Sequence, residues 1–208
     1  MLYTVYHRGI QCIGMGEHTN TEQRIARCAL RVLEKEGPEA VSMRRIASNV
    51  GITPMAIYHH FPSREELLRS VVEKEFEQLL DFIRKAPPRG SFEEDIVHIM
   101  DSYLDYGFAR PHIFDYMFSK VRQDARRFPD DFRARRSPTL NVIADAVARW
   151  MDEGRLKQDD VWEIAFELWA HAHGYLMLYR AGRFNLSQKE FKKLVQRSIK
   201  RLLDGLKS

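Results

Sequence analysis

The chain has 208 residues, of which 44% are hydrophobic and 30% charged, and its formal net charge is +4. This is typical of a globular protein with enough chain to bury a core in one or two domains. Two cysteines, Cys12 and Cys28, are too few for a disulfide framework. The longest apolar run, near residues 175–179, is far shorter than the ~20 residues of a membrane-spanning helix. The composition therefore excludes disulfide-rich and membrane-spanning proteins, and the net charge by itself does not indicate a nucleic-acid partner.

The N-terminal residues 1–18 show no helical period and no continuous apolar stretch of the kind that a secretory signal needs. We therefore expect a cytoplasmic protein with an irregular N-terminal extension, which is a tag, an extended start or a frayed arm. Met15 stands just before the first helix signal. A DNA-contacting arm is the alternative, although Arg8 is its one permanently cationic residue.

Apolar residues recur at intervals of three and four, without sustained alternation or hairpin signals, so we expect an all-α fold of about nine helices. The first helix begins at Thr19, with Glu22 at capping-box spacing, and ends at Gly37. The next helix runs from the N-cap Ser42 to Gly51. The third begins at Thr53, with a proline in its first position.

A fourth helix begins at Ser63, where Glu66 completes a capping box, and runs to about Lys85. Two prolines then halt the pattern, so residues 87–90 are the predicted boundary between modules. The remaining helices are expected near residues 91–109, 111–119, 137–153, 159–181 and 187–206. We therefore expect an extension over 1–18, a helical N-terminal domain over 19–86 and a helical C-terminal domain over 91–208.

Residues 42–61 have the pattern of a helix-turn-helix, two short helices joined by a turn that contains a glycine. The second helix of such a motif enters the major groove of DNA and presents its N-terminal half to base edges. Between Ser42 and Arg64 there are three arginines and no Asp or Glu, a net of +3 within 23 residues. In proportion to the 29 acids of the chain, about three acidic residues would be expected there. The local charge therefore favours a DNA-facing surface.

The run from Ile46 to Leu68 resembles the signature of the TetR family of transcriptional regulators. It contains Ile-Ala, then Gly-Ile-Thr-Pro, then Ile-Tyr-His-His-Phe-Pro-Ser-Arg-Glu-Glu-Leu-Leu. The resemblance implies that the helix beginning at Thr53 is the recognition helix, and that Arg44 reaches the DNA backbone or an adjacent base. Arg64 stands where the family usually has a lysine, so a phosphate contact with altered geometry is implied. The residues expected at the DNA are Ser42, Arg44, Thr53, Pro54, Met55, Tyr58, His59, His60 and Arg64.

Each of these residues also has a plain structural interpretation. Tyr58 and His60 can instead cap the small three-helix core. Met43 and Met55 are of a type that packs more often than it reads bases, and Arg45 can be a solvated charge. Ile46, Ala47, Ile57 and Phe61 are expected to be core residues.

Two C-terminal helices indicate a homodimer. Residues 161–180 are apolar nearly all round, so both faces need a cover, and one of them requires a partner. The last helix has a narrow apolar seam, and two such helices from each subunit would form a four-helix interface with two-fold symmetry. A dimer also suits a palindromic operator on double-stranded DNA. An intramolecular bundle is the alternative. The predicted interface residues are Phe191, Val195, Ile199, Leu202 and Leu206.

Two short C-terminal stretches resemble the WHG-type C-terminal domain of TetR proteins. They are residues 110–118, led by Arg-Pro-His, and residues 169–176, which contain Trp and His-Gly. The resemblance implies a helical ligand-binding domain. Aromatic and methionine residues around a few polar groups suit a small, largely apolar effector, although each is also a normal core residue. The expected pocket residues are Tyr103, Tyr106, Phe114, Met117, Phe118, Trp169 and His173.

Residues 120–136 carry seven cations and three acids. We interpret them as a solvated connector, with an entrance that attracts an anionic effector as the alternative.

The sequence thus favours a ligand-released transcriptional repressor, and the word repressor rests on the resemblance alone. An activator and an effector-free interaction module remain open. An enzyme is the rival class, but the sequence has no His-Glu-x-x-His, no Gly-x-Ser-x-Gly, no phosphate loop and no dinucleotide fingerprint. His171 and His173 point about 200° apart on a helix, so they cannot share a metal unaided. No metal or cofactor is expected.

Overall fold

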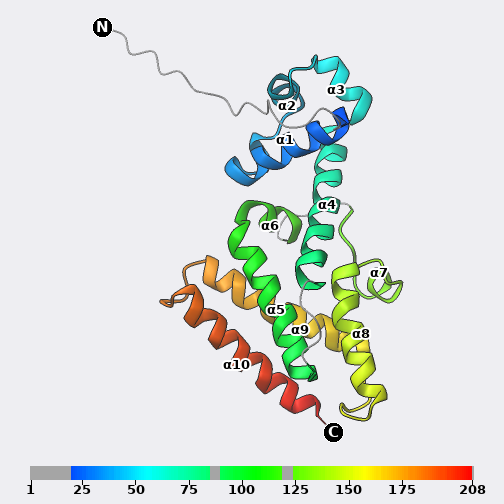
Figure 1. Ribbon diagram of the computed structural model, residues 1–208, viewed down its shortest axis with the longest axis vertical. Coiled ribbons are helices and arrows are strands. Elements are labelled where there is room, and N and C mark those ends of the chain that lie inside the picture. The colour runs from blue at the N-terminus through cyan, green and yellow to red at the C-terminus, as the bar shows by residue number, and fades with distance from the viewer. Residues whose placement is uncertain (1–19, 85–89, 119–123, 208) are drawn as a thin grey trace. The chain divides into compact units, whose positions relative to one another are not determined.

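The computed structural model describes residues 20–84, 90–118 and 124–207, and these contain ten α-helices and one short 3₁₀ helix (Figure 1). Within the described ranges no strand forms, and the only β-type pairing is an isolated bridge between Leu156 and Lys207. The all-α expectation is confirmed. The described residues divide into two compact units, one of residues 20–75 and 110–118, the other of residues 76–84, 90–109 and 124–207.

The first unit contains the N-terminal helices of the described chain. They are α1 (Thr21–Glu36), the 3₁₀ helix (Pro38–Ala40), α2 (Met43–Val50) and α3 (Pro54–His60), followed by the beginning of α4 (Arg64–Arg84). Helix α6 (Pro111–Phe118) also belongs to this unit and packs on α1. Fully buried apolar side chains hold the unit together, among them Ile25, Leu33, Ile46, Ile57, Leu67 and Phe114.

The helix starts show which capping predictions are right. Ser42 accepts a hydrogen bond from the backbone N–H of Arg45, and Thr53 accepts one from that of Ala56, so both predicted N-caps are confirmed. The predicted start at Thr19 is wrong, because Asn20 is the N-cap of α1 and accepts from the N–H of Glu22. Asparagine and threonine are both favoured N-cap residues, so the sequence pattern was compatible with either of the two neighbouring positions.

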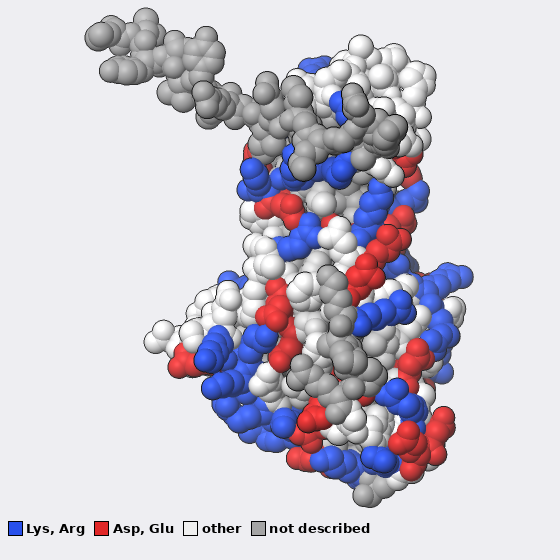
Figure 2. Space-filling view, in the orientation of Figure 1, with Lys and Arg blue, Asp and Glu red and all other residues white. Residues whose placement is uncertain are grey.

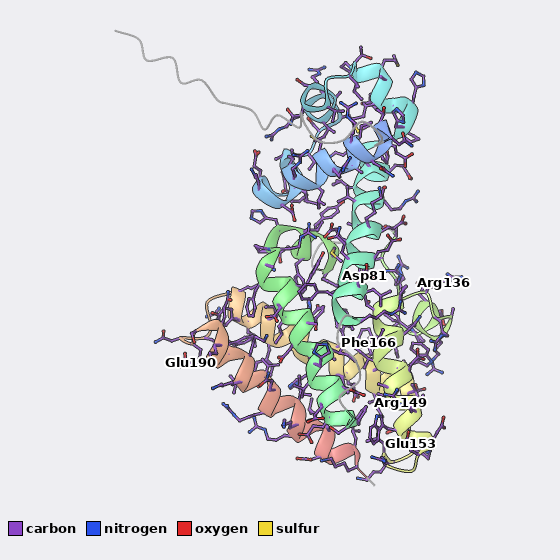
Figure 3. All side chains as sticks on the ribbon, in the orientation of Figure 1. Asp81, Arg136, Arg149, Glu153, Phe166 and Glu190 are labelled. Carbon is purple, nitrogen blue, oxygen red and sulfur yellow. The ribbon has the colours of Figure 1, made fainter. Side chains whose placement is uncertain are left out.

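The second unit is a helical bundle. It contains the end of α4, α5 (Phe92–Ala109), α7 (Asp130–Arg133), α8 (Pro138–Asp152), α9 (Val161–Arg180) and α10 (Gln188–Leu206). Helix α5 packs against α8, α9 and α10, and α9 also contacts α8 and α10. Ser187 and Glu190 form a capping box at the start of α10, where Figure 3 labels Glu190. Apart from α7, the helices after residue 90 lie within two residues of their predicted bounds.

Helix α7 was not predicted from the sequence. The stretch 120–136, interpreted as a solvated connector, is anchored in its second half, and its residues 120–123 lie outside the described part. Phe132 is buried, and its ring lies 5.5 Å from that of Phe166 on α9 (Figure 3). Arg133 pairs with Asp160 at 2.6 Å. The many charged residues of this segment favoured a solvated interpretation, but the buried Phe132 attaches the segment to the bundle.

Of the predicted boundary at residues 87–90, residues 87–89 lie outside the described part, and the boundary stays a prediction. The chain passes from the first unit to the second after Glu75, in the middle of α4, and returns at Arg110. None of the helices in the described residues is long and apolar enough to cross a membrane.

The turn between α2 and α3 provides a test of the fold. Gly51 has φ +76, and a Cβ added there would meet nothing within 4 Å. Gly51→Ala should therefore lower the free energy of unfolding by about 1 kcal/mol through backbone strain alone, as measured by urea unfolding. Gly205→Ala, in helical backbone that is equally open, is the control and should have no destabilising effect. Equal losses in the two variants would contradict this account.

Candidate nucleic-acid interface and ligand region

The orientation of α3 against α2 is fixed by a short, well-bonded turn. Gly51 adopts the left-handed conformation at the end of α2, and the N–H of Ile52 bonds to the carbonyl of Ala47 at 3.0 Å. From α1, the guanidinium of Arg24 donates to the carbonyl of Val50 at 2.9 Å. This hydrogen bond satisfies one of the free carbonyls at the end of α2. The role of Arg24 was not predicted from the sequence.

Helix α3 separates core residues from surface residues cleanly. Ile57 is fully buried and Phe61 is 5% exposed, as expected for core positions. In contrast, Met55 is 70% exposed and Tyr58 49% exposed. These values argue against a core-capping role for Tyr58 and against packing of Met55 within the chain. Thr53, Pro54, His59 and His60 are exposed as well.

The two adjacent arginines of α2 differ in their surroundings. Arg44 is exposed, and no hydrogen bond or ion pair in the described ranges involves it. Arg45 pairs with Glu36 at 2.6 Å and also donates to the carbonyl of Ala40. The hydrogen bond from Arg45 lowers the pKa of Glu36 below its ordinary value. Arg45 is therefore an ion-paired residue, and Met43, which is 7% exposed, is a packing residue.

Arg64 has a structural partner that the family pattern did not reveal. Its Nε donates to the carbonyl of Val41 at 2.7 Å, and a second nitrogen donates to the carbonyl of Pro38. These bonds hold the segment before α2 against the start of α4. A phosphate contact by Arg64 remains a prediction, but the side chain already has this bracing role.

The segment that forms α2 and α3 carries no acidic residues. Figure 2 shows mostly white surface with a few blue groups over the α2–α3 end of the first unit. The sequence has no Asp or Glu between Ser42 and Arg64. Such a surface does not repel a phosphate backbone, and it exposes a side-chain set of the kinds that contact bases and phosphates.

In the second unit, three of the predicted pocket residues are linked. The Tyr103 hydroxyl lies 2.8 Å from Nδ1 of His173, and the indole of Trp169 hydrogen-bonds Tyr103. Burial raises the pKa of Tyr103 well above its ordinary value, and the bond from Trp169 offsets this only in part. The rings of Trp169 and His173 lie 5.5 Å apart. A polar chain therefore joins α5 to α9 inside an aromatic environment.

The other predicted pocket residues are distributed over both units. Tyr106 is buried in the second unit. Phe114, Met117 and Phe118 lie on α6 in the first unit, where the rings of Phe114 and Phe118 are 4.7 Å apart. The structure thus brings together Tyr103, Trp169 and His173 as one cluster and the α6 residues as another.

The predicted dimer seam of α10 needs correction. Phe191, Val195 and Ile199 are 0–1% exposed within a single chain, so they form its core and offer no surface to a second copy. Phe191 packs on Tyr179 of α9, with ring centroids 4.4 Å apart. Of the five residues, Leu202 is 41% exposed and Leu206 is partly exposed. The seam is apolar because it faces α5 and α9 of its own chain.

A different side of α9 and α10 is uncovered. On α9, Ala170, Gly174 and Leu178 recur at intervals of four and are exposed, with Leu178 at 50%. Beside them, His171 and Tyr175 both reach the Ser198 hydroxyl of α10, at 3.0 and 3.2 Å. Burial lowers the pKa of His171. This side, completed by Leu194 and Leu202 of α10, is called the α9–α10 face.

The charged segment near α7 borders an open hollow in the second unit. Three arginines and two aspartates line it, and Arg136 at its rim pairs with Asp131 at 2.8 Å (Figure 3). The mixed charge leaves the anion-entrance interpretation untested. Across the described residues, no group of three or more His, Cys, Asp or Glu side chains could hold a metal ion. The lining residues are Asp124, Ala125, Arg126, Arg127, Asp131 and Arg136.

Comparisons with known proteins agree with this architecture. Residues 25–71 match the family model described as bacterial regulatory proteins of the tetR family, and residues 96–202 match the tetracyclin repressor-like C-terminal domain. The chain is 24% identical over 188 residues to the HTH-type transcriptional repressor AcnR of Corynebacterium efficiens, covering 88% of this chain and 94% of AcnR. The finer WHG assignment stays a prediction.

Two solved structures share the fold. A protein of unknown function from Rhodococcus sp. RHA1 has a TM-score of 0.78 at 19% identity, covering 92% of this chain and 98% of that one. FadR of Bacillus subtilis, solved in complex with stearoyl-CoA, has a TM-score of 0.66 at 14% identity, covering 84% and 95%. The two family models together span most of the described chain, and the protein belongs to the TetR family of transcriptional regulators.

Proposed function

We propose that the protein is a sequence-specific DNA-binding transcriptional repressor that a small, largely apolar effector releases from a palindromic operator. The observation that carries the proposal is the exposed set on α3. Met55 and Tyr58 project from a helix whose opposite side is fully buried, in a stretch without acidic residues. Such a helix can enter the major groove without losing core contacts. Its partner, DNA, assigns the protein to the cytoplasm.

The exposed side chains suggest a division of roles. Met55 offers an apolar contact for a thymine methyl, and Tyr58, His59 and His60 offer hydrogen-bonding groups for phosphates or base edges. The caps Ser42 and Thr53 fix the starts of the two helices, and Arg44 provides an exposed cation for the backbone.

Selection of bound duplexes from a random pool tests the proposed function. We expect a two-fold symmetric site whose half-sites lie about one helical turn apart, or a multiple of it. A panel of apolar compounds, together with the amphipathic stearoyl-CoA, the molecule bound in the Bacillus subtilis FadR structure, then tests release of the selected duplex. Failure to enrich any sequence would contradict specific DNA binding, and an asymmetric site would contradict the dimer.

Arg44→Ala tests the phosphate contact. We expect weaker binding to all duplexes and a salt slope of log affinity that falls by about 1, because one fewer counterion is released. Titrations at several salt concentrations measure the slope. Arg45→Gln is the matched control. Because Arg45 is already paired with Glu36, its replacement should leave the slope closer to that of the wild type. A changed sequence preference with an unaltered slope would refute the backbone role of Arg44.

The α9–α10 face is the proposed dimer interface. It is apolar or small along Ala170, Gly174 and Leu178, and small residues allow close approach of a second helix. The hydrogen bonds that His171 and Tyr175 form with Ser198 hold the two helices of one chain in register. A two-fold axis through this face would build a four-helix interface from two copies.

Introducing charge into this face should separate the subunits. The double variant Leu178→Lys/Leu202→Lys should sediment as a monomer and bind the palindromic duplex at least about 100-fold more weakly, because the half-sites are no longer read together. Lys193→Glu alters charge on the exposed side of α10 and should remain dimeric. A double variant that still sediments as a dimer would place the interface elsewhere.

The linked cluster of Tyr103, Trp169 and His173 is the proposed polar element of the effector site. Tyr103→Phe removes a buried hydroxyl from its partners, so we expect a loss of about 1–3 kcal/mol in unfolding free energy and a changed effector concentration for release. Urea unfolding and the release assay measure the two effects. Tyr179→Phe, at a half-buried hydroxyl that donates to the carbonyl of Leu186, is the control and should cost less. Equal effects of both changes on release would argue against this site.

A further inference from the structure

Three charged side chains of the first unit meet around Arg110. Its Nε donates to Oε1 of Glu34 on α1 at 2.6 Å, and another nitrogen pairs with the carboxylate of Glu75 on α4. The residue itself immediately precedes α6, and the N–H of Phe114 bonds to its carbonyl at 2.9 Å. One guanidinium therefore connects α1, α4 and α6, and the three side chains are called the Arg110 cluster.

Burial makes this cluster a firm attachment. The side chain of Glu75 is 0% exposed and that of Arg110 19% exposed. A buried carboxylate depends on its cation, since removal of one partner leaves an uncompensated charge in the interior. His112 adds a second connection from α6 to α1, because its Nδ1 lies 2.9 Å from the carbonyl of Glu34.

The cluster stands where the chain passes between the units. The chain leaves the first unit after Glu75 and enters it again at Arg110. Ala109, the last residue of α5, belongs to the second unit and is covalently joined to Arg110. A displacement at the end of α5 therefore acts directly on Arg110, and through its two carboxylate partners on α1 and α4.

Helix α1 in turn supports the helix-turn-helix. It packs on α2, and its Arg24 donates to the carbonyl of Val50 at the end of α2. A contiguous set of bonded contacts thus leads from Arg110 through Glu34 and α1 to the helix that precedes α3.

We infer that Arg110, Glu34 and Glu75 couple the second unit to the DNA-binding unit. Besides stabilising the fold, they transmit to the DNA-binding unit whether the second unit holds an effector. The inference rests on the proposed function for its biological meaning. Its physical content, that the two units share free energy through this cluster, is independent of DNA.

Urea unfolding tests the coupling without DNA. All three tryptophans, at positions 150, 162 and 169, lie in the second unit, so their fluorescence reports that unit alone. Ile46→Ala destabilises the first unit, because Ile46 is fully buried there, and should lower the fluorescence midpoint by about 1 M urea in the wild-type background. In the Arg110→Met/Glu75→Leu background, which removes both charges together, the shift should fall below half.

Matched variants keep this test decisive. Glu34→Gln breaks one arm of the cluster at a side chain that is 31% exposed, leaves Glu75 paired, and should reduce the shift partly even if the double variant does not fold. Asp145→Asn removes the surface pair with Arg135 in the second unit and should leave the shift unchanged. The inference is overturned if Ile46→Ala moves the fluorescence midpoint equally in all backgrounds, or in none.

Amide hydrogen exchange then connects the cluster to regulation. The selected duplex should slow exchange in residues 100–109 at least about 5-fold in the wild type and less than about 2-fold in Glu34→Gln, with duplex affinity within about 3-fold. Equal protection in both proteins, or a large loss of affinity in the variant, would contradict a coupling role. A wild type that binds no selected duplex would refute the proposed function, and the urea experiment would still decide the coupling.

Discussion

The buried pair of Glu75 and Arg110 is the constraint on which the first unit depends. Burying a carboxylate in the middle of α4 is costly unless a cation accompanies it, and the cation comes from the start of α6, 35 residues later in the chain. The pair therefore requires α4 and α6 to lie together, and the bond to Glu34 adds α1. Helix α1 then positions α2, on which α3 depends.

The DNA-binding end shows how local rules are combined with packing. Caps at Ser42 and Thr53 and the left-handed Gly51 fix the lengths of two short helices. Burial of Ile57 then decides which side of α3 is exposed. The two neighbouring arginines have the same chemistry but different roles, because Arg45 forms an ion pair with Glu36 and Arg44 does not. The proposed DNA-facing surface consists of side chains that are neither buried in the core nor held in ion pairs within the chain.

The C-terminal helices show the limit of apolar patterns. The seam of Phe191, Val195 and Ile199 was predicted as a subunit interface, but it is the core of one chain. An amphipathic stripe shows that a helix is covered and does not identify the helix that covers it. The uncovered side carries small residues and a hydrogen-bonded histidine–serine–tyrosine network. The residues along this side have only a weak apolar periodicity. It became apparent only when α9 and α10 were placed together.

The all-α class, the bounds of most helices, the two helix caps of the DNA-binding motif and the family could be predicted from the amino-acid sequence, because each depends on residues close together in the chain. Three features emerged only from the folded chain: the bracing roles of Arg64 and Arg45, the anchoring of a charged segment by Phe132, and the connection of α1, α4 and α6 by Arg110. These contacts join residues far apart in the chain, or depend on which of several similar groups is buried. Periodicity and composition contain neither kind of information. The helix-turn-helix could therefore be located from its sequence, whereas the contacts that support it could not.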